Sequence, residues 1–281
     1  MTNPSYDIEK VYKEFVTISN YFDENNVSNL INNTSAPIHN YCHYEDRSDS
    51  NKCLDYFEMT SSGVIHLLKD LKKKCNLDDD KLAEYAILWL IYKLNIKEKD
   101  KLTDLNKFYT DHIEKNKCYN DKINGDGSTY KDIINKKINL KDININEIFK
   151  LEPPFNILYY LYHEISDQNS FCKEYSNYAK TFADQFKNLN NDSNNIEGSS
   201  FSQILSTLLN DHNNLINKCP NFQPLPELTP KKKPVEGSAK GVEEISPQTP
   251  EVTPSSSSTL NTVIPVLSTF AIPVFLGVAY K

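Results

Sequence analysis

The sequence predicts an all-α fold for most of the chain, on three observations. Apolar residues recur at helical spacing in one segment after another, and no long segment alternates apolar and polar residues as a strand would. Glycine is scarce, with seven residues in 281, which disfavours turn-dense β folds and glycine-rich phosphate loops. Only 38 % of the residues are hydrophobic, so the helices should be amphipathic around a thin core. We expect one sizeable helical domain over residues 1–219.

The first half of the chain predicts four helices. They cover the apolar patterns of Ile8–Phe22, Val64–Cys75, Leu82–Leu94 and Leu102–Ile113. A polar loop, from Asp23 to about Thr60, separates the first two. Asp79 or Asp80 can cap the third helix, which is apolar nearly all round and should therefore form the centre of the core.

The second half predicts two short helical segments and three longer helices. In order, they are Lys131–Lys137, Ile145–Phe149, Phe155–Ser166, Cys172–Leu189 and Phe201–Cys219. Pro153 and Pro154 are well placed to start the first of the longer helices, because proline is favoured in a first helical turn. Polar loops are expected over Cys118–Tyr130 and Asn190–Ser200.

After residue 219 the composition changes twice. Pro220–Asn261 is rich in proline and serine and predicts a disordered stalk, with Lys231–Lys233 as a solvated charge run. Residues 262–281 predict a membrane anchor, because Val263–Tyr280 contains no charged residue and spans about 27 Å as a helix. The alternative is a lipid-anchor signal, since small residues at Ser255–Ser258 precede the apolar tail.

The charge and the termini limit the partners. A net charge of −7 disfavours nucleic acid, whose binding requires clustered cations. The lipid bilayer is the partner expected for Val263–Tyr280. Met1–Glu24 has no apolar signal-peptide core, which by itself favours insertion after synthesis, with the domain left in the cytosol.

Six cysteines precede the stalk, and they favour a domain outside the cytosol. They are Cys42, Cys53, Cys75, Cys118, Cys172 and Cys219. An even number in a membrane-tethered domain predicts three disulfides, with 15 possible pairings, and Cys42–Cys53 is the most plausible local bridge. The alternative is six reduced, buried thiols in a cytosolic domain.

One loop carries the best candidate ligands for a metal ion. His39, Cys42, His43 and Cys53 have a spacing that fits no common zinc module, and adjacent Cys42 and His43 would be awkward joint ligands. We therefore expect a loop-closing disulfide, and no metal or cofactor.

No catalytic residue is predicted. Glu84, Asp111 and Glu164 lie on separate amphipathic helices, and nothing in the sequence pairs two of them for acid–base chemistry. Pairing Cys118 or Cys172 with a nearby histidine as a nucleophile is less plausible than a structural disulfide. The chain also lacks the common hydrolase, nucleotide-binding and zinc-protease motifs, so no small-molecule substrate is expected.

Tyrosines are abundant, and three of them share one predicted helix. Tyr159, Tyr160 and Tyr162 cannot all face one core, so the exposed rings could serve a binding face. The simpler expectation is that tyrosine suits a half-buried helix, because it has an apolar body and a polar tip.

Several segments, in order, resemble the Plasmodium interspersed repeat (PIR) family, the Cir/Yir/Bir variant antigens. They are Leu105–Ile123, Tyr130–Leu140, Phe171–Asn190, Phe201–Cys219 and the serine-rich stalk with its Ile-Pro-containing anchor. The resemblance implies an all-α, disulfide-bonded surface or exported antigen without catalysis. The chain departs from the family in lacking a cysteine near its start and another in Phe155–Tyr162, and it ends at Lys281 without a basic tail.

Together these observations predict a membrane-anchored variant surface antigen, with its N-terminal domain outside an infected host cell or parasite. Its partners would be a host receptor or antibodies, and its roles host interaction and immune evasion. The alternative is a cytosol-facing, tail-anchored structural or trafficking protein with reduced cysteines.

Overall fold

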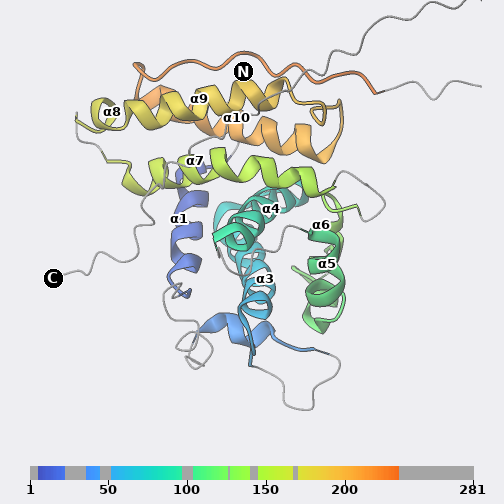
Figure 1. Ribbon diagram of the computed structural model, residues 1–281. Coiled ribbons are helices and arrows are strands. Elements are labelled where there is room, and N and C mark those ends of the chain that lie inside the picture. Colours follow the sequence, from blue (N-terminus) through green and yellow to red (C-terminus); the bar gives the residue numbers. More distant parts are fainter. Residues whose placement is uncertain are drawn as a thin grey trace, which may run out of the picture. The chain divides into compact units, whose positions relative to one another are not determined.

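The structure is a computed structural model, which describes residues 6–22, 36–44, 52–96, 104–125, 127–139, 145–166 and 170–233. Within these ranges the chain is mostly helical, with isolated β-bridges and no strand, which confirms the all-α prediction for them (Figure 1). The α-helices are α1 (Ile8–Ser19), α3 (Tyr56–Cys75), α4 (Asp79–Ile96), α5 (Leu105–Phe108), α6 (Tyr130–Asn135), α7 (Glu152–Glu164), α8 (Phe171–Glu174), α9 (Ser176–Asn190) and α10 (Ser200–Lys218). Short helical turns are η1 (Pro37–Tyr41), η2 (Tyr109–Ile113), η3 (Lys117–Asn120) and η4 (Ile145–Leu151).

Local capping fixes where the helices begin and end. The Asp55 side chain accepts a hydrogen bond from the Glu58 backbone at the start of α3, and Asn76 ends this helix in the left-handed conformation, with φ 52°. Thr129 and Asp132 form a reciprocal capping box at the start of α6. These contacts satisfy amide groups that a helix end leaves without partners.

Helix α4 forms the centre of the core, as its apolar sequence predicts. Trp89 and Tyr85 of this helix are fully buried. Helices α3, α6, α7 and α10 all pack against it. Figure 1 shows α3 and α4 between α1 on one side and α5 and α6 on the other, while α7, α9 and α10 cross one end of this group.

Helix α3 packs tightly against α4 at Gly63. A Cβ atom at this position would lie 2.7 Å from Cη2 of Trp89 and 3.2 Å from Cζ of Phe22. Glycine is therefore needed here to let the Trp89 ring pack against the α3 backbone.

The segment from Phe222 to Lys233, here called the strap, differs from its prediction as the start of a disordered stalk. It lies along α9 in an extended conformation (orange in Figure 1). Asn190 binds it twice, donating to the Glu227 carbonyl (2.9 Å) and accepting from the Thr229 amide (2.9 Å). Its far end pairs with the loop before α10, where the Lys231 amide donates to the Asn195 carbonyl. These bonds offset the ordering entropy that a proline-rich segment alone would not recover.

The remaining C-terminal predictions lie outside the described residues. These are the stalk beyond Lys233 and the anchor at Val263–Tyr280. Among the helices that the structure describes, none is long and apolar enough to cross a bilayer.

Candidate functional site

Four of the six cysteines form two disulfides. Cys42–Cys53 closes the loop between η1 and α3, and Cys172–Cys219 joins α8 to the end of α10. The prediction of a third disulfide is wrong, because Cys75 and Cys118 are free, buried thiols.

The two free thiols lie in different surroundings. Cys75 ends α3 near Glu14 and Lys10 of α1, whereas Cys118 lies in η3 against the backbone of His43. Burial raises the pKa of each thiol to about 11, so both remain protonated at neutral pH. This is the opposite of what a nucleophilic cysteine requires.

Three of the four candidate metal ligands make structural contacts. Cys42 and Cys53 are consumed by their disulfide, and Nδ1 of the buried His39 accepts a hydrogen bond from the Cys53 amide (3.1 Å). Within the described residues, no three histidine, cysteine or acidic side chains are grouped as metal ligands would be.

The three carboxylates considered for catalysis have separate partners. Glu84 is buried and pairs with Lys81 (2.6 Å) and Lys137 (3.0 Å). Asp111 of η2 pairs on the surface with Lys107 of α5 and with Lys115, which follows η2. Glu164 pairs with its neighbour His163 and accepts from Tyr175. These contacts occupy the three carboxylates in ion pairs and hydrogen bonds between side chains.

A buried carboxylate that was not among the sequence candidates joins four helices. Asp211 of α10 is fully buried and accepts hydrogen bonds from Tyr12 of α1 (2.9 Å) and Tyr85 of α4 (2.8 Å). Tyr162 of α7 donates to the Asp211 carbonyl (2.7 Å). Burial raises the pKa of Asp211 to about 7, against the two tyrosine hydrogen bonds, which lower it.

The next residue, His212, is also fully buried. Its ring stacks on Phe182 of α9, with centroids 4.8 Å apart, and neither nitrogen bonds to a residue that the structure describes. Burial lowers the pKa of His212 to about 4. A signal for both residues was present in the sequence, because they interrupt the apolar face of α10 between Leu208 and Leu215.

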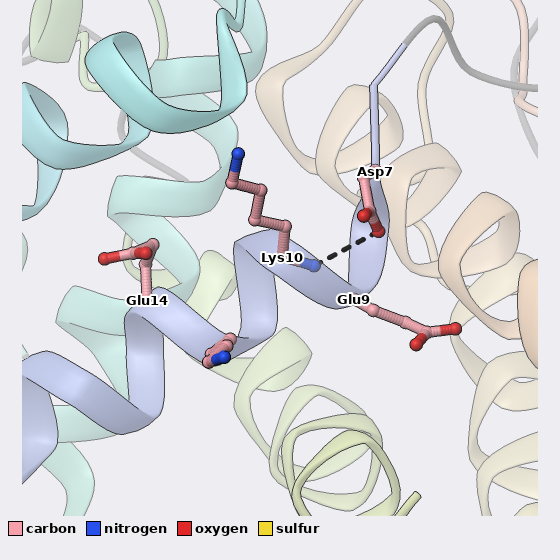
Figure 2. Close-up of a pocket in the computed structure, with 5 residues that line it drawn as sticks. Asp7, Glu9, Lys10 and Glu14 are labelled. Carbon is pink, nitrogen blue, oxygen red and sulfur yellow. Dashed lines mark hydrogen bonds between the residues drawn. The ribbon is translucent and has the colours of Figure 1, made fainter. Parts of the chain in front are cut away.

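A shallow hollow of about 400 Å³ lies along the polar side of α1 (Figure 2). Its lining carries charges of both signs, with Asp7, Glu9, Lys10, Lys13 and Glu14. The two glutamates already have partners, since Glu14 pairs with Lys74 (2.7 Å) and Glu9 with Lys218 (2.8 Å). The hollow therefore offers no uniform charge to a ligand.

Three half-buried tyrosines, here called the tyrosine face, meet where α7 ends and α9 begins. The Tyr160 ring lies 5.8 Å from Tyr175 and 5.0 Å from Tyr178, centroid to centroid, and the last two lie 6.0 Å apart. Of the three tyrosines predicted to share a helix, Tyr162 faces the core and Tyr159 packs on Tyr92. Only Tyr160 contributes to this face.

Two comparisons with known proteins identify the family. The sequence model described as Plasmodium variant antigen protein Cir/Yir/Bir matches residues 12–281. The chain belongs to this family. A solved structure of a Plasmodium PIR protein ectodomain is also similar, with 30 % identity and a TM-score of 0.57, covering 80 % of this chain and 99 % of that one. No curated protein matches.

Membership of the Cir/Yir/Bir family confirms the resemblance drawn from the ordered segments. It identifies the chain as a member of a variant surface antigen family and supports a surface or exported location. It does not favour the alternative of a cytosol-facing, tail-anchored protein.

Proposed function

We propose that this chain is a membrane-anchored variant surface antigen that presents its helical domain to host molecules or antibodies. It acts by binding and by exposing a variable surface, without catalysis. The observation that carries this proposal is the family match over residues 12–281. The similarity to a solved PIR ectodomain supports it.

The contacts of the reactive side chains support a binding role over catalysis. Cys172 is held in a disulfide, Cys118 is a buried thiol with a raised pKa, and Asp211 is enclosed by tyrosine hydroxyls. These groups stabilise the domain. The two disulfides also fit an oxidising exterior better than the cytosol.

The anchor is part of the same proposal. In this proposal Val263–Tyr280 is the segment that anchors the chain in the bilayer. The family match supports this, because it continues through residue 281. Pro265 and Pro273 also fit a transmembrane segment better than a soluble helix. The lipid-anchor alternative predicts a mature protein that ends near Ser256 with an ethanolamine adduct, which mass spectrometry of the C-terminus would detect.

Protease treatment of intact infected cells tests the location. If the domain lies outside, trypsin should cut at the exposed Lys231–Lys233 or beyond and remove the domain from the cells, while cytosolic proteins stay intact. Degradation of the domain only after the membranes are permeabilised would reject the proposal. The cysteines provide a second check, since the exterior location requires two intact disulfides and two alkylatable thiols in the unfolded, unreduced protein.

A further inference from the structure

The tyrosine face presents three partly exposed aromatic rings to a partner. Tyr160, Tyr175 and Tyr178 are each half-buried and lie within about 6 Å of one another, so one approaching side chain can contact more than one ring. Tyrosine is enriched among the residues that dominate binding energy at interfaces, because it offers a large apolar ring with a polar tip.

The scaffold under this face is rigid. The Cys172–Cys219 disulfide ties α8 to the end of α10, and the Asn221 side chain donates to the Cys172 carbonyl (3.0 Å). Beneath Tyr175, the buried Phe171 ring packs at 4.9 Å, and Phe171 in turn contacts Phe222. Rings held in place before binding lose little entropy when a partner docks.

The chemistry of the face favours a cation. The Tyr175 hydroxyl donates to Oε2 of Glu164 (3.3 Å), which places a partly exposed carboxylate beside the rings. Burial and the charges of Glu164 and Glu174 raise the pKa of Tyr175, so its hydroxyl stays neutral. Aromatic faces attract cations, and a guanidinium group can stack on a ring while it pairs with a carboxylate. His163 contacts the other oxygen of Glu164, so Oε2 is the oxygen beside the Tyr175 ring.

The tyrosine face and the exit of the strap lie at opposite ends of α9. Tyr178 lies in the first turn of α9, whereas Asn190, at the other end of this helix, holds the strap from which the chain leaves the domain. The 15 residues of α9 separate these ends by about 22 Å. Figure 1 shows α8 and the exit of the strap at opposite ends of α9.

We propose that the tyrosine face is the docking surface for a partner protein that presents an arginine side chain, stacked on the rings and paired with Glu164. This inference rests on the proposed binding function and names the surface and the chemistry of its partner.

A peptide titration of the full chain in a neutral detergent tests this. The probe is the peptide acetyl-Gly-Arg-Gly-amide, and the matched control replaces arginine by citrulline, which has the same shape without the charge. With ¹³C-labelled tyrosine rings, the NMR signals of the tyrosine face should shift saturably with the arginine peptide and about five-fold more weakly, or not at all, with citrulline. The ring of Tyr159 should not respond.

Two variants and one control variant sharpen the test. Tyr178→Ser and the isosteric Glu164→Gln should each weaken binding by about five-fold. Tyr159→Ser is the control, because Tyr159 lies on the same helix as Tyr160 but packs on Tyr92. This variant should leave binding of the arginine peptide unchanged. If Tyr178→Ser fails to fold, Glu164→Gln alone still tests whether the arginine peptide binds at this face. Equal binding of citrulline, equal shifts across all tyrosines, or insensitivity to Glu164→Gln would overturn the proposal. Protease accessibility tests the surface location separately, so the two proposals can fail independently.

Discussion

Asp211 and His212 are adjacent, fully buried and shifted in opposite directions, so their effects on stability should oppose each other. Burial raises the pKa of Asp211 from 3.8 to about 7 and lowers that of His212 from 6.5 to about 4. Between about pH 4 and pH 6.5 the native state therefore holds a protonated aspartic acid and a neutral histidine. The unfolded chain holds an aspartate and an imidazolium.

The sign follows from the protons bound in each state. For Asp211 the folded state binds the extra proton, so its contribution to stability is complete below pH 3.8 and is lost as the pH rises towards 7. For His212 the unfolded state binds the extra proton, so its contribution is complete above pH 6.5 and is lost as the pH falls towards 4. Each slope is about 1.4 kcal/mol per pH unit, and across this window the two slopes cancel.

Single substitutions should reveal how each residue alone changes the free energy of unfolding with pH. Asp211→Asn keeps an acceptor for one tyrosine and a donor for the other but removes the titration of Asp211, so stability should fall by about 3 kcal/mol from pH 6.5 to pH 4 relative to the wild type. His212→Leu removes the titration of His212, so stability should fall by about 3 kcal/mol from pH 4 to pH 6.5 relative to the wild type. Urea unfolding of the full chain in a non-ionic detergent, followed by circular dichroism at half-unit pH steps, measures both.

The comparison of each variant with the wild type at the same pH removes the titrations that they share. Asp184→Asn, at an exposed position of α9, is the matched control and should run parallel to the wild type. Parallel curves for Asp211→Asn and the wild type would refute the reasoning. They would show that the pKa of Asp211 is not raised in the native state.

Three further predictions follow from single contacts. Gly63→Ala should destabilise the domain by about 1–2 kcal/mol in urea unfolding, because overpacking against the buried Trp89 outweighs the gain in helix propensity, whereas Gly125→Ala, with open space around it, should be near neutral. Asn190→Ala should speed hydrogen exchange of the Thr229 and Lys231 amides and leave α4 protected, and unchanged exchange there would show that the strap is held by other contacts. Replacing both Cys172 and Cys219 by serine should lower the free energy of unfolding by about 4 kcal/mol, and replacing both Cys42 and Cys53 by about 3 kcal/mol. The difference is expected because the first bridge closes a loop of 47 residues and the second a loop of 11. Equal losses in urea unfolding would contradict this.

The sequence predicted helices best where their buried face is purely apolar. Helix α4 was expected at the centre because almost every position from Ala83 to Leu94 is apolar, and it lies there. The start of α3 was expected too late, because Thr60, Ser61 and Ser62 interrupt the pattern. They are nevertheless fully buried, with Ser61 donating to the His112 carbonyl and Ser62 to the Tyr41 carbonyl. Such partners are distant in sequence and cannot be foreseen from a local pattern.

The candidate site shows the same limit. Composition correctly marked the proline-rich segment as poor in apolar residues, but it could not show that Asn190 would bind its backbone. The family could be proposed from ordered segments, because these depend only on the sequence. The tyrosine face could be foreseen only in part, since Tyr160 meets Tyr175 and Tyr178 through the packing of α7 on α9.

The arrangement of these contacts explains how one fold can carry a variable surface. The domain is held by the fully buried rings around Asp211, by the contact of Gly63 with Trp89, and by the two disulfides. The exposed sides of its helices carry mostly lysine, asparagine and acidic residues, whose substitution usually changes stability by less than about 0.5 kcal/mol. A chain built in this way can exchange its exposed residues while it keeps its core. The solved PIR ectodomain agrees, since it keeps a similar fold at only 30 % identity. A face that binds a partner cannot vary so freely, because the rings and the carboxylate that recognise an arginine must stay together.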